Sequence, residues 1–487
     1  MYYPSKKEFL KLAKRTNVIP VYREILGDRL TPVSAFLRVK NDHSYLLESV
    51  EGEEKIARFS FIGVEPSLIF KSKGNSVELT ESGKARKFTT DMPLNELKRV
   101  MSRFKPAVVK GLPRFFGGMV GYMGYDAVRF FEDIPDNNPD DLKMPDSIFM
   151  LADNLIIFDH STHRIKVLVN AYNGAGQVYD EAVKKIDRII KKLNSPLKKS
   201  KSAGKKTGPH VIKSNFTKKG FEGSVKKAKE YIKAGDIIQV VISQRFYTTL
   251  NCDPLDVYRA LRSLNPSPYM YYLDFGGIKM IGSSPELLVR CENDIVEVRP
   301  IAGTRPRGKN EDEDKGLEKE LLADAKERAE HVMLVDLGRN DIGRVSRPGS
   351  VRVNDFMFVE KYSHVMHIVS DCEGRLAEGK DAYDVLRAVF PAGTVTGAPK
   401  IRAMEIIDEL ENTRRGPYAG AVGYFSFSGN MDTCINIRTI VVNGKDAFIQ
   451  AGAGIVADSM PAKEYQETVN KAKAMVGAIK AAEEGLL

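Results

Sequence analysis

The sequence predicts an α+β fold, a large layered α/β sandwich of mostly antiparallel sheets with helices. Turn dipeptides such as Gly276-Gly277 and Asn293-Asp294 separate apolar, β-branched runs, a pattern typical of hairpins. Segments of helical periodicity stand apart from these runs instead of following each strand, which disfavours a doubly wound parallel sheet. The 487 residues, 43% of them hydrophobic, suffice for a large core and for two or three domains.

The first region covers residues 1–195 and mixes helices with short strands. A stretch rich in glycine and aromatic residues, 115–131, predicts close backbone packing under bulky neighbours. An amphipathic helix is predicted over 179–193. Strands are predicted over 44–50, 57–64 and 67–72.

A lysine-rich connector, residues 196–213, follows the first region. Seven lysines fall between Lys191 and Lys206, so most of the excess behind the net charge of +10 is local. No aromatic residue interleaves with them, so a stacking platform for single-stranded nucleic acid is not supported. We interpret the connector as an exposed, flexible linker and expect no nucleic-acid binding.

The second region, residues 214–487, begins with a helix that Ser214 or Asn215 can cap and that ends at Gly235. Strands and helices follow in separate runs, which is the basis of the layered prediction. The strands are predicted over 237–250, 269–275, 279–284, 287–291, 295–300, 421–427, 433–442 and 447–456, and the helices at about 316–339, 381–390, 400–411 and 461–482.

Two of these helices each carry a pair of glutamates three residues apart, Glu327 with Glu330 and Glu464 with Glu467. Positions three apart share a helix face, so each helix offers two carboxylates side by side. If the two helices meet, four carboxylates converge and require a cation. Carboxylate-only ligation selects a hard cation, for which Mg2+ is the expected ion. The alternative is that both pairs belong to solvated helix faces.

The helix that carries Glu327 and Glu330 is expected to be mostly buried, which weakens the solvated-face alternative because buried carboxylates need compensation. This expectation rests on its apolar positions, Val332, Leu334, Val335 and Leu337.

The second glutamate pair follows a stretch with small residues. Gly452 and Gly454 allow backbone N–H groups to face a cavity and bind an anion, although a tight turn is the alternative. The helix itself is predicted to start at Pro461, with Asp458 and Ser459 as capping candidates.

Two further stretches hold candidate binding and acid–base groups. Arg299, Arg305 and Arg307 lie among glycines and can hold carboxylate groups, the alternative being a basic surface loop. His364 and His367 are either structural or, where a reacting group lies near, general acid–base residues.

These features together indicate a pocket with a hard cation, an anion-binding glycine segment and at least one arginine. Arg438, within a predicted strand, is a candidate partner for a substrate carboxylate. The matching ligand is a small polyanionic acid.

Bulk features exclude other classes. No apolar run reaches membrane-spanning length and the first residues form no secretory signal, so we expect a cytoplasmic protein. The four cysteines lie far apart without a C-x-x-C pair, which fits reduced structural thiols and disfavours a zinc site.

The chain contains, in this order, the stretches GDIIQVVISQR, IGSSPELLVR, RPIAGTRPRG, EHVMLVDLGRND, SHVMH, FPAGTVTGAPK, GPYAGAVGYF, QAGAGIVADS and EYQETVNKAKAM. Together they resemble the chorismate-utilising enzymes and, within these, the anthranilate synthase component I family, from about Leu46 to Ile479. The resemblance implies a Mg2+-dependent lyase that converts chorismate and ammonia to anthranilate and pyruvate, the first committed step of tryptophan biosynthesis. It also implies a large α/β sandwich around the active site.

The resemblance also assigns site residues. Glu330 and Glu467 are implied as the main Mg2+ ligands, and Glu327 and Glu464 as supporting the metal directly or through water. The Mg2+ is expected to hold the ring carboxylate of chorismate. The implied substrate-binding residues are Gly303, Thr304, Tyr418, Arg438, Gly452, Ala453 and Gly454.

The implied catalytic residues are Glu286, His367 and Thr304. Glu286 matches the family's general acid for the departing C4 hydroxyl, with a pKa expected to be raised by the other carboxylates and by burial. His367 matches the histidine beside the reacting ring that serves the later elimination of pyruvate.

Two positions separate the branches of this family. Isochorismate and salicylate synthases carry a water-activating lysine at the position of Gln239, and aminodeoxychorismate synthases carry a nucleophilic lysine at the position of Ala302. With neither lysine present, direct attack of ammonia at C2 is the remaining route. The alternatives are an aminodeoxychorismate synthase, or a tryptophan-binding regulatory protein without catalysis.

The resemblance finally implies a partner and an inhibitor. The chain has no glutaminase signature, so a separate glutamine amidotransferase subunit is expected to supply ammonia in a heterotetramer. Feedback inhibition by tryptophan is expected at a second site, formed by Ser49, Pro268, Tyr269 and Met270.

Overall fold

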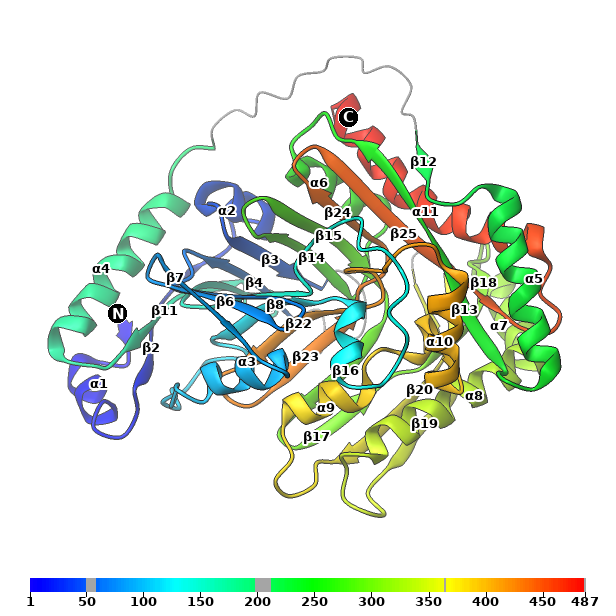
Figure 1. Cartoon of the computed structure of the whole chain (residues 1–487). Coiled ribbons are helices and arrows are strands. Elements are labelled where there is room, and N and C mark those ends of the chain that lie inside the picture. The colour runs from blue at the N-terminus through cyan, green and yellow to red at the C-terminus, as the bar shows by residue number, and fades with distance from the viewer. Residues whose placement is uncertain (50–57, 198–211, 363–364, 486–487) are drawn as a thin grey trace.

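The structure, a computed structural model, describes residues 1–49, 58–197, 212–362 and 365–485. Two large antiparallel sheets stack face to face, with helices on their outer faces (Figure 1). This arrangement confirms the predicted α+β sandwich.

The first sheet has 13 strands from both chain regions. In spatial order they are β1 (Tyr2–Tyr3), β2 (Val18–Leu26), β11 (Arg164–Tyr172), β10 (Asn154–Asp159), β4 (Phe59–Val64), β3 (Ser44–Glu48), β14 (Tyr269–Asp274), β15 (Ile278–Ser284), β24 (Thr439–Asn443), β25 (Asp446–Ile455), β13 (Gln239–Thr249) and β12 (Lys213–Ser214), with β21 (Gly397–Ala398) also paired to β13.

The second sheet has 12 strands, again from both regions. In spatial order they are β18 (Ile301–Pro306), β20 (Val365–Arg375), β17 (Ile295–Val298), β16 (Leu287–Glu292), β23 (Met431–Ile435), β22 (Ala421–Ser426), β8 (Gly118–Met123), β9 (Ser147–Leu151), β5 (Leu68–Lys73), β6 (Ser76–Glu81) and β7 (Lys84–Thr89), with β19 (Arg352–Lys361) paired to β20.

The helices cover the outer faces of the sheets. Buried side chains of α2, α4, α6, α10 and α11 pack with strands of the first sheet, and those of α3, α8 and α9 with strands of the second. Their bounds are α1 (Lys6–Leu12), α2 (Pro32–Val39), α3 (Pro93–Met101), η1 (Tyr125–Phe130), α4 (Gly176–Leu193), α5 (Lys218–Ala234), α6 (Pro254–Leu264), α7 (Glu311–Ala323), α8 (Ala325–Gly343), α9 (Ala382–Val389), η2 (Gly393–Val395), α10 (Lys400–Leu410) and α11 (Pro461–Glu484).

A third apolar cluster lies between the two sheets. It joins side chains of the first sheet, such as Tyr45 and Tyr271, to side chains of the second, such as Tyr122 and Val422. The glycine-rich stretch is part of this region, and a Cβ on Gly121 would lie 1.9 Å from the carbonyl oxygen of Ile148. The predicted close backbone packing is therefore confirmed.

Residues 1–195 and 214–487 share both sheets. Strand β3 pairs with β14, with Met270 opposite Glu48, and β8 pairs with β22. The two regions are therefore not separate layers but interleaved parts of the same two sheets. Most of the predicted connector, residues 198–211, lies outside the described residues.

Several details of the helix predictions are wrong. Thr217, not Ser214 or Asn215, caps α5, because its side chain accepts a hydrogen bond from the Gly220 amide while Ser214 belongs to β12. The helix still ends at Gly235 in a left-handed conformation, as predicted.

The helix expected at about 316–339 is two helices, α7 and α8. Asp324 ends α7, and its side chain accepts hydrogen bonds from the Lys326 and Glu327 amides at the start of α8. Helix α8 is only partly buried: Leu334 and Val335 are buried, but Val332 is 46% exposed.

Helix α11 begins with Pro461 in its first turn, as predicted. Its N-cap residue is Met460, without a side-chain cap, so neither Asp458 nor Ser459 caps it. The Ser459 hydroxyl instead accepts a hydrogen bond from the Val456 amide.

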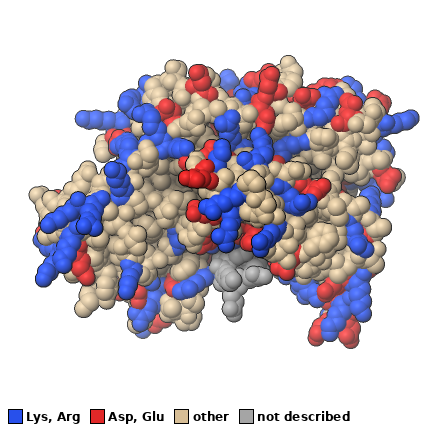
Figure 2. Space-filling model, turned by 90° about the horizontal axis from the view of Figure 1, so that it is seen from below, with Lys and Arg blue, Asp and Glu red and all other residues tan. Residues whose placement is uncertain are grey.

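The surface charges, the helix lengths and the cysteines bear on the expectations from composition. On the face seen in Figure 2, basic and acidic side chains are largely intermixed. No helix among the described residues is long and apolar enough to cross a bilayer. All four cysteines are free thiols, as predicted.

Candidate active site

Glu330 on one glutamate-bearing helix lies within electrostatic range of Glu467 on the other. Glu330 of α8 is partly buried, and the Gln239 side-chain amide donates a hydrogen bond to it at 3.2 Å. Burial raises the pKa of Glu330, and the charges of Glu327 and Glu467 raise it further. Because Glu467 belongs to α11, the two predicted pairs face one another across the site.

The four carboxylates do not form a closed cluster. Arg305 pairs with Glu327 at 3.5 Å, and Lys471 pairs with Glu467 at 2.7 Å. Within the described residues no group of three or more His, Cys, Asp or Glu side chains is close enough to hold a metal ion. The expected convergence of four carboxylates is therefore not seen, because protein cations neutralise two of them locally.

The donor chemistry of this place nevertheless fits a hard cation. Its side chains offer oxygen atoms, and the Gln239 Oε1 atom beside Glu330 is buried without a hydrogen-bond partner. Burial and the charge of Glu467 also raise the pKa of Glu464. Excess negative charge and an unpaired oxygen are both relieved by a divalent ion.

Glu286 lies between β15 and β16, with its carboxyl enclosed by protein. Burial raises its pKa to about 7, while Thr394, Lys471 and Arg438 lower it. The predicted direction is confirmed, but the expected contribution of other carboxylates is wrong, because the charged neighbours of Glu286 are cations. The Thr394 hydroxyl is buried and lacks a partner of good hydrogen-bond geometry.

His367 on β20 is oriented by the β18 backbone. Its Nδ1 atom lies 2.8 Å from the Gly303 carbonyl oxygen and 3.1 Å from the Thr304 hydroxyl. A carbonyl only accepts, so Nδ1 carries the proton and Nε2 is left as a proton acceptor. Burial lowers the pKa of His367, which favours this neutral form. His364 lies outside the described residues.

Gly303 sits at an irregularity in the β18–β20 ladder, with a φ of +65°. A Cβ there would lie 3.2 Å from Glu327 Oε2. Glycine therefore allows both the positive φ and the close approach of the Glu327 carboxylate.

The three arginines around this segment bind the protein's own carboxylates. Arg299 pairs with Glu360 at 2.5 Å and Arg307 with Asp314 at 2.5 Å. Arg305 pairs with Glu320 and Asp324, both at 2.9 Å, as well as with Glu327. They hold carboxylates, as predicted, but these belong to the chain.

Residues 452–454 form an extended part of β25, paired with β13. The alternative of a tight turn is wrong, since Gly452 lies opposite Ser243 in a regular ladder, and anion binding by this segment stays a prediction. The glycines make room for side chains: a Cβ on Gly452 would lie 2.7 Å from the Tyr418 hydroxyl, and one on Gly454 2.6 Å from the Gln239 amide nitrogen. Ala453 between them is fully buried.

Two polar side chains lie next to this strand, the buried Tyr418 and the half-buried Arg438. Burial raises the pKa of Tyr418 to about 12, while Arg438 and a hydrogen bond with the Gly452 backbone lower it. Burial lowers the pKa of Arg438, opposed by Tyr418, Glu467 and Glu286. Arg438 thus lies within electrostatic range of Glu286, Tyr418 and Glu467, which places these groups in one site.

Lys471 is a site residue that the sequence analysis missed. Its ammonium group lies 2.7 Å from Glu467 Oε1 and 3.0 Å from the Gly452 carbonyl oxygen. Its position four residues after Glu467 was the available signal, because such positions share a helix face.

The residues expected to bind tryptophan also come together. Ser49, Pro268, Tyr269 and Met270 line one cavity, because β3 pairs with β14. The Tyr269 hydroxyl donates a hydrogen bond to Asp432 at 3.0 Å. Aromatic side chains complete the walls, among them Phe59, Phe61 and Tyr424.

Comparison with known proteins shows one family over nearly the whole chain. Residues 42–477 match the chorismate binding enzyme family. The chain is 55% identical over 485 residues to anthranilate synthase component 1 of Aquifex aeolicus, covering 99% of this chain and 98% of that protein. It is 50% identical over 492 residues to that of Acetivibrio thermocellus, covering 99% and 100%.

Solved structures agree. Anthranilate synthase component I from Streptococcus pneumoniae superposes with a TM-score of 0.78 at 40% identity, covering 93% of this chain and 98% of that one. The menaquinone-specific isochorismate synthase of Escherichia coli has a TM-score of 0.70 at 18% identity, covering 98% and 99%, and shares the fold.

Proposed function

The chain belongs to the chorismate binding enzyme family, and from this premise we propose that it is the large subunit of an anthranilate synthase. It converts chorismate and ammonia to anthranilate and pyruvate. The observation that carries this choice within the family is the pair Gln239 and Ala302. The first is a buried amide that donates to Glu330, and the second a buried methyl group in β18. Neither can activate water or attack the ring.

Glu286 serves as the general acid. With a pKa of about 7, it is protonated in a substantial fraction of molecules at neutral pH and can donate to the departing C4 hydroxyl. His367 presents Nε2 as a proton acceptor beside the ring, held by the Gly303 carbonyl, and serves the elimination of pyruvate. Thr304 contacts the same imidazole and the substrate.

The carboxylates of chorismate are held by buried polar groups. Arg438 supplies the positive charge, and Tyr418, Gly303 and the Gly452–Gly454 segment supply further contacts. Glu330 and Glu467 would hold Mg2+, supported by Glu327 and Glu464. Mg2+, when bound, neutralises the ring carboxylate. Lys471 and Arg305 hold two of these carboxylates in place.

Ammonia is supplied by a glutamine amidotransferase subunit, with which the chain forms a heterotetramer. Support comes from the shared name component 1 of its relatives, and from the absence of a glutaminase signature in the sequence. Tryptophan binds the cavity at Ser49 and Met270 and inhibits the enzyme. A cytoplasmic location remains a prediction.

The decisive experiment supplies the purified chain with chorismate, Mg2+ and ammonium at alkaline pH and follows anthranilate fluorescence. Anthranilate is the expected product. Aminodeoxychorismate in its place would identify the other branch. Tryptophan binding without any turnover or Mg2+-dependent chorismate binding would indicate a regulatory protein.

A further inference from the structure

Strand β13, which backs the glycine segment of the site, lacks a neighbouring strand along part of its outer edge. Gln239 and Val240 pair with β21, and Phe246 and Tyr247 pair with β12. The backbone groups between these two short ladders need other partners, because buried amides and carbonyls are costly when unpaired. Thr396 binds the Val241 amide and Asn215 binds both backbone groups of Arg245. Two side chains from the segment after α10 fill the middle of the gap.

Arg415 and Glu411 supply the partners in the middle of this edge. Arg415 Nη2 donates to the Val241 carbonyl at 2.7 Å, and Glu411 Oε1 accepts from both the amide and the hydroxyl of Ser243 at 2.8 Å. The two side chains bind each other at 2.6 Å and 3.0 Å. They thus continue the ladder of β13 in place of a strand.

Arg415 of this pair also contacts two other parts of the site, the segment at Thr394 and Tyr418. Arg415 Nη1 donates to the Val395 carbonyl at 2.7 Å, next to Thr394, which lies beside Glu286. The guanidinium group also lies over the ring of Tyr418, 5.5 Å from its centroid. Arg415 therefore contacts both Val395, the residue after Thr394, and the substrate-binding Tyr418.

The register of β13 extends this link to the glycine segment. Val241 lies opposite Gly454, and Ser243 lies opposite Gly452. The backbone groups of β13 that the pair holds are therefore directly across the ladder from the residues that face the substrate.

The burial of this ion pair is nearly complete, with 1% of the Arg415 and 3% of the Glu411 side chain exposed. Such a pair loses the hydration of both charges and is weak as a source of stability, whereas it imposes a single geometry. We propose that Arg415 and Glu411 are positioning residues. They fix three parts of the site relative to one another: Tyr418, residues 452–454, and the segment at Thr394 that lies beside Glu286. The inference deepens the proposed function and rests on it.

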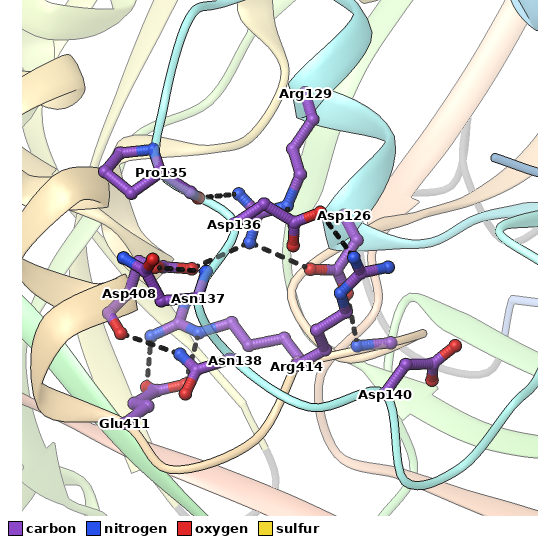
Figure 3. Close-up of polar contacts among 12 residues, drawn as sticks. Asp126, Arg129, Pro135, Asp136, Asn137, Asn138, Asp140, Asp408, Glu411 and Arg414 are labelled. Atoms are coloured by element: carbon purple, nitrogen blue, oxygen red, sulfur yellow. Dashed lines mark hydrogen bonds and ion pairs between the residues drawn. The ribbon is translucent and has the colours of Figure 1, made fainter. Parts of the chain in front are cut away.

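A neighbouring ion pair provides a matched control. Asp408 lies in α10, which Glu411 follows as the C-cap residue, and is as buried as Glu411, at 5% exposure each. It pairs with Arg129 at 2.9 Å and accepts from the Asn137 amide at 3.1 Å. These two partners belong to the segment of residues 129–138 (Figure 3), and neither is a residue of the candidate active site.

The test compares Glu411→Gln with Asp408→Asn, two changes that remove one buried charge each without changing shape. For Glu411→Gln we expect kcat/KM for chorismate to fall by about 100-fold, mostly through KM, and the pH profile of Glu286 to shift. Asp408→Asn is expected to lower the melting temperature and to leave KM and the pH profile within about 2-fold of the original. Arg415→Lys keeps the charge and is expected to retain more activity than Arg415→Met.

Hydrogen exchange of the peptide that contains residues 450–456 gives a readout that does not depend on the reaction. Faster exchange in Glu411→Gln, but not in Asp408→Asn, supports positioning. Equal exchange in both variants, or losses of kcat/KM that only follow melting temperature, would overturn it. An unmodified chain that forms no anthranilate would instead refute the proposed function, and the exchange comparison would still decide the role of the pair.

Discussion

The active site and the cavity at Ser49 and Met270 differ in how their polar groups are satisfied. In the active site, Gln239 Oε1 is buried without a partner, and the buried Thr394 hydroxyl has Glu286 beside it but no hydrogen bond of good geometry. In the cavity, none of the described lining residues has a buried side-chain nitrogen or oxygen without a partner. Glu48, for example, accepts from Tyr258 at 2.5 Å and from Arg262 at 3.1 Å.

This difference separates two kinds of recognition. A site with unpaired buried groups gains when a ligand supplies the missing hydrogen bonds, so it is suited to a polar, charged substrate. A cavity whose polar groups are already paired offers shape and apolar surface, which suits an aromatic side chain. The following predictions test this contrast, from the largest effect to the smallest.

Removing one ligand charge should have the largest effect. Glu330→Gln and Glu467→Gln are each expected to reduce Mg2+-dependent turnover by more than about 100-fold, since a charged oxygen ligand becomes an amide. Turnover of chorismate is measured against Mg2+ concentration. Glu484→Gln, an exposed change on the same helix α11, is the control and should behave like the original chain. Equal Mg2+ dependence in all variants would refute the ligand assignment.

Glu286→Gln should reduce kcat by about 100-fold or more, because the amide has no proton to donate at neutral pH. In the original chain the acid must be protonated, so kcat should fall as pH rises through about 7. The measurement is made at a fixed concentration of free ammonia, since the unprotonated fraction of ammonia rises with pH. The variant should lose this limb of the profile, and a limb that persists in it would assign the acid elsewhere.

Ionised Glu286 also carries a stability cost. Its folded pKa of about 7 lies above the ordinary glutamate value of 4.5, so the stabilising contribution of the protonated form is fully present below pH 4.5 and is lost as pH rises through 7. Glu286→Gln should therefore melt at a higher temperature than the original chain at pH 8. A thermal melt at pH 5 and pH 8 checks this, and the gain should be smaller at pH 5.

Changes in the cavity should affect inhibition and spare catalysis. Ser49→Arg fills the space with a charged side chain, and Met270→Thr removes buried apolar surface. Each is expected to raise the inhibition constant for tryptophan by about 10-fold or more, while turnover without tryptophan stays within about 2-fold. Unchanged inhibition constants in both variants would remove tryptophan from this cavity.

The smallest effect is expected from thiol reagents. Burial raises the pKa of the Cys434 thiol, which lines the same cavity, and that of Cys291 to about 11. Few thiolates form at pH 8, so alkylation should leave both turnover and tryptophan inhibition nearly unchanged. Rapid loss of inhibition on alkylation would show that the cavity wall is open to solvent.

The sequence predicted the sheet architecture well because hairpin signals are local. The turns at Gly276-Gly277 and Asn293-Asp294 connect antiparallel strands, as expected. The break at Asp324 was missed although its capping pattern was readable, because helical periodicity continues on both sides.

The candidate site was predicted in its residues but not in its charge balance. The carboxylates of α8 and α11 could be found by their spacing. Arg305 could not be assigned to Glu327, because a strand and a helix meet only in the folded chain. The buried ladder partners of β13 were equally invisible, since Arg415 and Val241 lie 174 residues apart.

The ladders β3–β14 and β8–β22 tie the early and late parts of the chain together. A protease cut between Leu197 and Ile212 would therefore yield two fragments that stay associated through these ladders. Neither fragment, expressed by itself, could complete either sheet. Co-expression of both is the route by which a gene split at this point would still give an assembled enzyme.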